Sequence, residues 1–366
     1  MRNTRNYVKQ ALFKNHLTLS FPRTLNTRTN RVMIVKKLMH KEIQQFLTGH
    51  LGKRDLKLEP IKKGGSDRAF FRVILPKNNR YIFMHYGTEV EENSFWSGIN
   101  DFLTRLGISV PRIIAQDTAR RFILMEDLGD VDLYSQASAP WKIRREYYFQ
   151  ALTQIHRLHS FAVKSLPADV QLSESYGPRL YKWEHDYFLE NLVCKVCKIK
   201  LSVFESQKLN NELDALSEHL QKIKSCLIHR DFQSQNIMIK NRKPVFVDFQ
   251  GMRRGNLFYD LGSLICDPYV KFTFEERNEL LDFYYELTEP EYNRAEFVDN
   301  FWEAAAQRLM QALGAYGFLG LKKGKRKFLG HIDNGIKNLV LATSCMETLP
   351  ALNELAQRCE NILTNQ

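Results

Sequence analysis

Residues 227–260 read LIHRDFQSQNIMIKNRKPVFVDFQGMRRGNLFYD, and this stretch decides more about the fold than any other part of the chain. It contains the pattern H-R-D-x-x-x-x-N, which places Asp231 five residues before Asn236. A short apolar segment that we expect to form a strand, residues 245–247, leads into a second carboxylate at Asp248. A carboxylate, a carboxamide and a second carboxylate in this order are typical of a phosphoryl-transfer site.

The chemistry of phosphoryl transfer explains why these residue types occur at this spacing. The transferred group carries negative charge on its oxygens, so catalysis depends mainly on positioning and on cations. Mg²⁺ prefers oxygen ligands, so we expect Asn236 and Asp248 to hold it beside the phosphates of ATP. Asp231 would orient the acceptor hydroxyl and take its proton, and Arg230 of the same motif is predicted as a second catalytic residue. The alternative, a chance tripeptide on a turn, does not explain the flanking strands or the second carboxylate.

Several further segments agree with this stretch and together resemble a known family. They are HRDFQSQN (229–236), VDFQG (247–251), YDL (259–261), DPY (267–269), MEDLGD (125–130), AQR (306–308) and LG (313–314). On these segments the chain resembles the phosphotransferases related to aminoglycoside and choline kinases. It is most similar to the bacterial sugar kinases that phosphorylate N-acetylmuramate and N-acetylglucosamine at the anomeric hydroxyl. The resemblance covers about residues 40–345, and D-F-Q-G in place of D-F-G favours this subgroup over protein kinases.

The resemblance implies an α+β, two-lobed protein-kinase-like fold. An antiparallel-sheet N-lobe over residues 38–127 would carry the nucleotide loop and the hinge. A mainly helical C-lobe over residues 128–366 would carry the catalytic and substrate-binding residues. With 366 residues and 44% apolar content, the chain can bury the cores of both lobes. The resemblance also implies ATP and Mg²⁺ as cofactors and an amino sugar as substrate, with a sugar-phosphate nucleotidyltransferase as a possible pathway partner.

Residues 1–37 account for most of the positive charge of the chain. They contain nine Lys and Arg and no Asp or Glu, so a formal net charge of +12 becomes +3 for the remainder. That remainder does not indicate a nucleic-acid partner. We expect a disordered or mis-assigned extension, with a start at Met33 or Met39; a transit peptide and a nucleic-acid-binding arm are the alternatives. Six scattered cysteines, and apolar runs too short for a membrane span, favour the cytoplasm.

The nucleotide is expected to lie under a glycine-containing hairpin turn of the N-lobe. Gly64, Gly65 and Ser66 would let backbone N–H groups approach the ATP phosphates. The third strand, predicted over residues 81–86, has no Lys to hold those phosphates, in contrast to protein kinases. Arg68 is the preferred substitute because a guanidinium can bind two phosphate oxygens at once; a solvated loop arginine is the alternative.

A second arginine and the hinge complete the expected nucleotide site. Arg72 is the other candidate for the phosphate clamp, and Glu92, near the start of the next predicted helix, could pair with the clamping arginine. In the kinase-like frame that the resemblance implies, backbone groups of Met125, Glu126 and Asp127 would hydrogen-bond to adenine. An ordinary strand-to-helix connection is the alternative for this segment.

Substrate recognition is less constrained by the sequence. Gln233, Tyr269 and Arg308 are the predicted acceptor contacts, because a sugar needs hydrogen-bonding groups beside an aromatic surface. Asp260 and His229 are assigned supporting roles. The resemblance implies that Asp260 steadies the catalytic loop through hydrogen bonds to its backbone.

Two other functions are kept as alternatives. An aminoglycoside or another amino alcohol could be the acceptor if Glu184, Asp186 and Asp267 line an acidic cleft. A catalytically silent, nucleotide-binding module would account for the missing third-strand Lys, although the intact catalytic motif opposes it.

Overall fold

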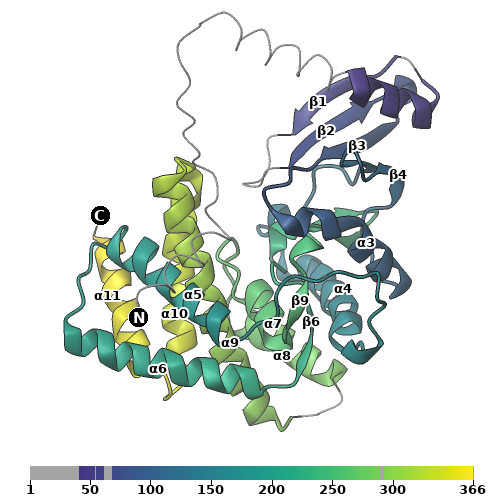
Figure 1. Ribbon diagram of the computed structural model, residues 1–366. Coiled ribbons are helices and arrows are strands. Elements are labelled where there is room, and N and C mark those ends of the chain that lie inside the picture. The colour runs from purple at the N-terminus through teal and green to yellow at the C-terminus, as the bar shows by residue number, and fades with distance from the viewer. Residues whose placement is uncertain (1–40, 54, 62–67, 289–291, 366) are drawn as a thin grey trace, which may run out of the picture. The chain divides into compact units, whose positions relative to one another are not determined.

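The computed structural model describes residues 41–53, 55–61, 68–288 and 292–365, and the chain divides into two compact units. The first unit ends at Asp55, and its described part contains a helix over residues 41–51, where the apolar spacing predicts one. The second unit begins at Leu56 and contains all the other described helices and strands (Figure 1).

A five-stranded antiparallel sheet opens the second unit, with strand order β1-β2-β3-β5-β4. Phe83 pairs with Phe71 on one side and with Leu124 on the other, so these three side chains share one face of the sheet. Phe83 and Leu124 are fully buried, which makes this face part of the apolar core. The strands are β1 (Lys57–Ile61), β2 (Ala69–Ile74), β3 (Arg80–His85), β4 (Ile113–Asp117) and β5 (Phe122–Glu126). The turn predicted at Gly64, Gly65 and Ser66 lies outside the described residues.

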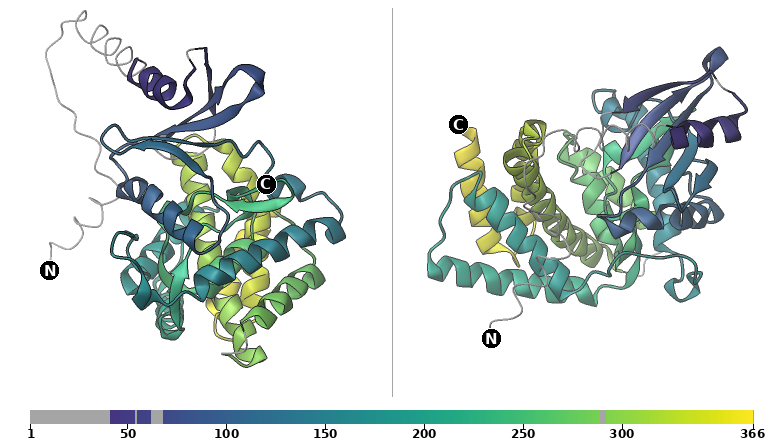
Figure 2. Two further views of the ribbon diagram at one scale, coloured as in Figure 1. Left: turned by 90° about the vertical axis from the view of Figure 1, so that its right-hand side faces the viewer. Right: turned by 45° about the horizontal axis from the view of Figure 1, so that its top comes forward.

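Most of the remaining second unit is helical. Figures 1 and 2 show the sheet at one end of this unit and α5, α9, α10 and α11 at the other. The helices are α3 (Trp96–Arg105), α4 (Trp141–His159), α5 (Pro178–Phe188), α6 (Val203–Lys222), α7 (Leu257–Ile265), α8 (Phe274–Leu287), α9 (Arg294–Gly317), α10 (Ile332–Ser344) and α11 (Pro350–Thr364). Short 3₁₀ segments connect several of them, including η2 (Glu91–Phe95), η3 (Tyr134–Gln136) and η9 (Arg326–His331).

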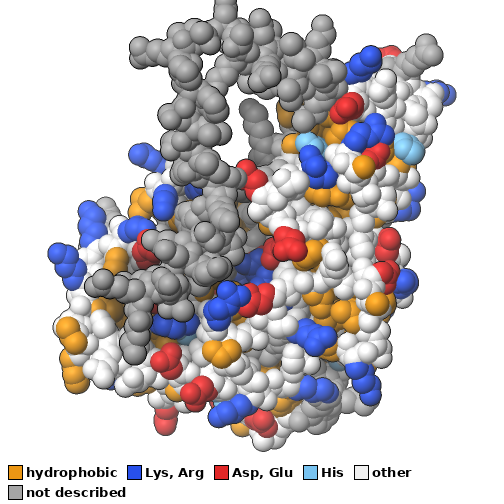
Figure 3. Space-filling model, viewed as in Figure 1, with side chains coloured by type: hydrophobic (Ala, Val, Ile, Leu, Met, Phe, Trp, Pro, Cys, Tyr) orange, Lys and Arg blue, Asp and Glu red, His pale blue; other side chains and the backbone are white. Residues whose placement is uncertain are grey.

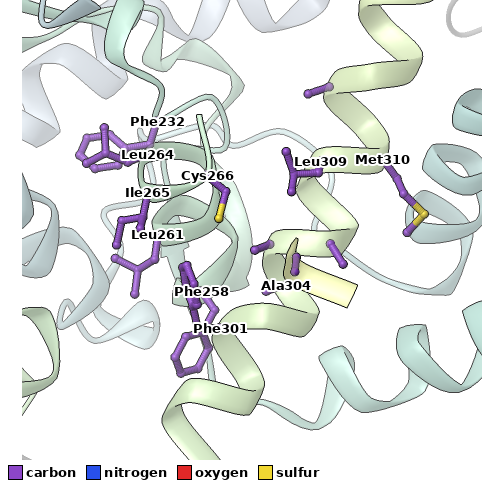
Figure 4. Packing of buried hydrophobic residues seen from close by; sticks show 14 of the residues in the cluster. Phe232, Phe258, Leu261, Leu264, Ile265, Cys266, Phe301, Ala304, Leu309 and Met310 are labelled. Carbon is purple, nitrogen blue, oxygen red and sulfur yellow. The ribbon is translucent and has the colours of Figure 1, made fainter. Parts of the chain in front are cut away.

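Helix α9 forms the centre of the helical part. Its residues 300–314 are all buried, and it packs against α5, α7 and α10. The contact with α7 is close, because a Cβ atom on Gly262 would lie 2.7 Å from the Cα of Ala305. Figure 4 shows the apolar side chains of α7 and α9, among them Phe258 and Phe301, gathered in the core. This packing fixes α7 and α9 relative to one another, and both helices carry residues of the site described below.

Two short two-stranded antiparallel sheets flank the catalytic motif. Strand β6 (Ser225–Ile228) pairs with β9 (Arg253–Asn256), and β7 (Ile237–Lys240) pairs with β8 (Lys243–Phe246). Asn241 and Arg242, which connect β7 to β8, have φ values of 51° and 62°, as a tight two-residue hairpin turn requires. The eight residues between β6 and β7 are the motif segment 229–236, which we call the catalytic loop.

This arrangement confirms the predicted α+β, two-lobed fold, with an antiparallel sheet followed by a mainly helical region. The predicted boundary between the lobes, after residue 127, falls inside the second unit, directly after β5. In the described part of the chain, residues 41–365 with three gaps, we find no helix that is both long and apolar enough to cross a membrane.

Candidate active site

A buried carboxylate on α7 holds the start of the catalytic loop. Asp260 is fully buried, and its two carboxylate oxygens accept hydrogen bonds from the backbone N–H groups of His229 (2.7 Å) and Arg230 (2.8 Å). Arg230 has a φ of 77°, a left-handed conformation that is unfavourable for a residue with a side chain. The charge-assisted hydrogen bonds to Asp260 therefore stabilise a strained turn immediately before Asp231.

A second buried carboxylate holds the middle of the same loop. Asp267 accepts hydrogen bonds from the backbone N–H of Ser234 (2.7 Å), from its hydroxyl (2.5 Å) and from the N–H of Tyr269 (2.9 Å). Burial raises the pKa of the Asp267 carboxyl, and these three donors oppose that rise. His229 adds a third link, since its Nε2 lies 3.1 Å from the carbonyl oxygen of Val247, which follows β8. The loop is thus attached at three points to the rigid core.

The carboxylate of Asp231 lies between two arginine side chains. Its Oδ2 is 3.5 Å from Nη1 of Arg230, and its Oδ1 is 3.6 Å from Nη2 of Arg308. Burial acts to raise the pKa of Asp231, but the positive charges of Arg230 and Arg308 outweigh it, so the pKa is lowered. The side chain remains 30% exposed. Asp231 is therefore an ionised and partly exposed carboxylate.

Arg308 is itself held in place by neighbouring side chains. It is buried on α9, where its Nε donates to the hydroxyl of Ser263 (3.1 Å) and its Nη1 to Gln311 (2.6 Å). The sequence predicts Arg308 as an acceptor contact, and the structure places it against the Asp231 carboxylate. Gln233, another predicted acceptor contact, is half-buried in the loop, and its backbone N–H donates to the Asp231 carbonyl (2.9 Å).

The two predicted metal ligands are neighbours in the β7–β8 hairpin. The N–H of Val247, the residue before Asp248, donates to the carbonyl of Asn236 (2.9 Å). The side-chain N–H of Asn236 donates to the Asp231 carbonyl (2.9 Å), which leaves its amide oxygen for a cation. A carboxylate and an amide oxygen are hard ligands that suit Mg²⁺. Among the described residues no group of three or more His, Cys, Asp or Glu could enclose a metal. Phosphate and water oxygens would therefore complete the shell.

Arg68 contacts Asp248, one of the two predicted metal ligands, directly. Its Nη2 lies 2.5 Å from Oδ1 of Asp248, and its Nη1 donates to Oε1 of Gln250 (2.8 Å). Gln250 in turn donates through Nε2 to the same Asp248 oxygen (2.9 Å). The sequence predicts Arg68 as a phosphate clamp, and the structure places it against the predicted metal ligand Asp248, beside the glutamine that distinguishes D-F-Q-G.

The other charged residues of the expected phosphate clamp have different partners. Glu92 does not pair with Arg68; its Oε1 accepts hydrogen bonds from the guanidinium of Arg253 (3.0 Å) and the hydroxyl of Ser173 (2.8 Å). That expectation is wrong because Arg253, contributed by β9, supplies the nearer cation. Arg72 pairs with Asp127 at the end of β5 (Nε to Oδ2, 2.6 Å).

The hinge residues use several of their polar groups within the protein. Met125 is a buried member of β5. The backbone N–H of Glu126 donates to the carbonyl of Arg112 (3.0 Å), and its carboxylate accepts a hydrogen bond from Lys240 (2.5 Å). Lys240 also donates to the backbone carbonyl of Asp127 (3.1 Å). These contacts join the hinge to β7, and the adenine-binding role of Met125, Glu126 and Asp127 stays a prediction.

Aromatic side chains from four segments gather beside the catalytic loop. The Tyr269 ring lies 4.4 Å from His331, 5.6 Å from Tyr134 and 5.8 Å from Tyr316, measured between ring centroids. We call these four residues the aromatic wall. Burial raises the pKa of Tyr269 to about 12, and the charges of Asp267, Arg308 and Asp231 also act on its hydroxyl. Segment η3, which contains Tyr134, contacts the 3₁₀ turn Ser234–Asn236 of the catalytic loop.

The sequence identified one member of the aromatic wall and missed the others. Tyr269 follows Asp267 in a family-like motif, whereas Tyr134 and His331 lie in segments without a motif. The only sequence signal for His331 is its position after a basic run, residues 322–327, which contains five Lys and Arg and no acidic residue. Lys327, at the end of that run, lies over the ring of its neighbour Phe328 (5.3 Å), and Phe328 stacks on Tyr316 of the wall.

The sheet, the catalytic loop and the paired Asn236 and Asp248 define a kinase-like phosphotransferase. Comparison with known proteins supports this class. The model of the phosphotransferase enzyme family matches residues 57–298, more than half of the chain. The chain therefore belongs to this family, and it is an ATP-dependent phosphotransferase.

Individual relatives show which members of the family the chain is similar to. The N-acetylmuramate/N-acetylglucosamine kinase of Pseudomonas aeruginosa is 24% identical over 307 residues, which cover 81% of this chain and 87% of the relative. Among solved structures, the choline kinase of Cryptosporidium parvum superposes with a TM-score of 0.60 at 15% identity, covering 87% of this chain and 99% of the other. The aminoglycoside phosphotransferase APH(2'')-Ib gives 0.54 at 14% identity, covering 86% and 98%. These two structures show the fold alone.

Proposed function

We propose that the chain transfers the γ-phosphoryl group of ATP to the anomeric hydroxyl of an N-acetylated amino sugar, such as N-acetylmuramate or N-acetylglucosamine. The observation that carries the reaction is Asp231, an ionised and accessible carboxylate held between two guanidinium groups. The relatives named as N-acetylmuramate/N-acetylglucosamine kinases support the choice of acceptor.

Asp231 would orient the acceptor hydroxyl and receive its proton as the new O–P bond forms and the bond from the γ-phosphorus to the bridging oxygen breaks. No covalent enzyme intermediate is needed. A carboxylate with a lowered pKa is a weak base, so it suits an acidic hydroxyl. An anomeric hydroxyl is more acidic than other sugar hydroxyls because the ring oxygen withdraws electron density from it. The bound Mg²⁺ would supply positive charge to the phosphates, with Asn236 and Asp248 as its protein ligands.

The aromatic wall suits the apolar face of a sugar ring. Tyr134 is 36% exposed, so part of its ring is available to a ligand, and it lies beside the catalytic loop. Aromatic faces also bind quaternary ammonium groups, as a choline-type acceptor would require. Lys327 opposes that alternative, because it lies over the Phe328 ring, which stacks on Tyr316 of the wall, and so adds a positive charge there. In Figure 3, Lys and Arg side chains gather on the helical part, over the end of α9 and beside α10 and α11.

The acidic cleft that a cationic antibiotic would need is not formed by the three carboxylates considered from the sequence. Glu184 is fully buried and accepts hydrogen bonds from Tyr176, Tyr259 and Gln307. Asp267 is engaged with the catalytic loop. Asp186 pairs with Lys182 on the exposed side of α5. None of the three is free to bind an aminoglycoside amine.

An acceptor panel tests this proposal. The purified full-length chain would be assayed for ADP release with ATP, Mg²⁺ and each of N-acetylmuramate, N-acetylglucosamine, kanamycin and choline. The methyl glycoside of N-acetylglucosamine, in which the anomeric oxygen is blocked, is the matched control. We expect ADP release with the two free sugars and none with the glycoside. Turnover of kanamycin or choline, or equal turnover of the glycoside, would contradict the proposal.

The product of this reaction would be a sugar 1-phosphate. Such a compound is the substrate class of sugar-phosphate nucleotidyltransferases, so an enzyme of that class is the proposed next step. The need for ATP and the six free thiols are consistent with a reaction in the cytoplasm.

A further inference from the structure

The most informative contact outside the expected catalytic scheme is that between Arg68 and Asp248. One guanidinium nitrogen contacts the Asp248 carboxylate at 2.5 Å, and another contacts Gln250 at 2.8 Å. The Arg68 side chain is 10% exposed and that of Asp248 is 36% exposed. An arginine therefore already neutralises the carboxylate that a divalent metal would have to bind.

The carboxylate is held in a fixed position while it makes this contact. Asp248 adopts a left-handed conformation (φ 65°, ψ 31°), and Gln250 donates to the same oxygen that Arg68 contacts. Gln250 thus joins both members of the ion pair. Because this charged pair is partly buried, separating it is costly unless each partner receives a new counter-ion.

We propose that Arg68 and the divalent metal compete for Asp248. Before nucleotide binds, Arg68 is the counter-ion of Asp248; when metal and ATP bind together, the metal takes over the carboxylate and Arg68 moves to the phosphate oxygens. The inference rests on Asp248 as a metal ligand, which is part of the proposed function. In this proposal Arg68 takes the phosphate-binding role of the third-strand Lys, a residue that β3 (Arg80–His85) does not contain.

Charge balance explains why the exchange requires both ligands. Metal alone would displace Arg68 from Asp248 without offering its guanidinium a new anion. ATP alone would attract Arg68 and leave Asp248 facing the phosphates without a cation. Only the metal–nucleotide complex supplies a cation for Asp248 and an anion for Arg68 together. The metal and the nucleotide should therefore strengthen each other's binding through Arg68. Arginine suits this exchange because its planar guanidinium can bind both carboxylate and phosphate through two hydrogen bonds.

The test uses Mn²⁺ alone as the metal probe on the full-length, nucleotide-free chain. Free Mn²⁺ is measured by electron paramagnetic resonance, and ATP affinity in the presence of Mg²⁺ is measured by calorimetry. In Arg68→Ala we expect Mn²⁺ to bind about 5-fold more tightly, because its competitor is gone, and ATP to bind about 10-fold more weakly, because its clamp is gone. The two affinities should change in opposite directions, which a general loss of structure cannot produce.

Three variants make the outcome unambiguous. Arg120→Ala removes a different ion-paired arginine of the same sheet, on the turn before β5, and should change neither affinity. Arg68→Lys keeps the positive charge but lacks the planar guanidinium. Its ATP affinity should therefore lie between those of wild type and Arg68→Ala. Asp248→Asn should abolish Mn²⁺ binding. If this variant binds Mn²⁺ as tightly as the wild-type protein does, Asp248 is not a metal ligand.

If Asp248→Asn behaves as expected but Arg68→Ala binds Mn²⁺ no better than wild type, the competition is overturned. Unchanged ATP affinity in Arg68→Ala would overturn the transfer to phosphate.

Discussion

The catalytic loop and the aromatic wall lie side by side but are built in different ways. The loop is one continuous segment, residues 229–236, held by the buried carboxylates Asp260 and Asp267. The wall is assembled from side chains that are far apart in the sequence, such as Tyr134 and His331. We therefore propose that the loop determines the chemistry and that the wall determines the acceptor.

The largest expected effect comes from removing the catalytic carboxylate. In Asp231→Asn, kcat should fall by about 10³-fold or more, because the hydroxyl loses both its orienting acceptor and its proton acceptor. Steady-state ADP release measures the loss, and calorimetry should show ATP binding close to that of wild type. Substantial turnover by this variant would show that another group serves as the base.

The next effect concerns the stability of the loop. Asp260→Asn replaces a charged acceptor of two backbone N–H groups in a fully buried position, and we expect a loss of about 2–4 kcal/mol in the free energy of unfolding. Urea unfolding measures it. Asp333→Asn, an exposed ion-paired carboxylate on α10, is the matched control and should change stability by less than about 1 kcal/mol. Equal stability of the two variants would mean that Asp260 does not hold the loop.

A change in the wall should affect acceptor binding and leave the chemical step intact. Tyr134→Ala should raise the KM for the sugar about 10-fold with little change in kcat, because it removes one aromatic surface without touching Asp231. Tyr134→Phe keeps the ring and should behave like wild type. If Tyr134→Ala instead lowers kcat with an unchanged KM, the wall and the loop would not be functionally separate.

The smallest effect is on pH dependence. The folded-state pKa of Asp231 lies below its ordinary value near 4, so the carboxylate stays ionised as the pH falls from 8 to 5, and its contribution to stability is lost only at lower pH. We therefore expect a flat kcat over this range. Arg308→Gln removes one of the two cations, which should raise the pKa of Asp231 and move the acidic decline of kcat to higher pH by about one unit. An unmoved decline in a folded variant would contradict the electrostatic role of Arg308.

The same contrast explains how much of the molecule the sequence could predict. Asp231, Asn236 and Asp248 were recognisable because their spacing is fixed by one hairpin, and the two-lobed fold followed from the family resemblance. Asp260 was identifiable for a similar reason, since it lies in the YDL motif (259–261) that follows β9, the next strand along the chain.

Partners across the fold could not be predicted in this way. The sequence suggested that Glu92 would pair with Arg68, but which arginine reaches a carboxylate depends on distances between elements, and β9 brings Arg253 closer. Tyr134 and His331 carry no motif, and only the packing of η3 and η9 around Tyr269 brings them together. A motif identifies residues within one segment, whereas the pairing of residues across segments leaves no pattern in the sequence.

The position of the phosphate in the product tests the central claim most directly. The full-length chain would be incubated with ATP, Mg²⁺ and N-acetylglucosamine or N-acetylmuramate, and the product examined by phosphorus–proton correlation NMR. We predict a phosphorus signal coupled to the anomeric proton, and no such product from Asp231→Asn. Phosphate on another hydroxyl, or no sugar phosphate from either acceptor, would contradict the account.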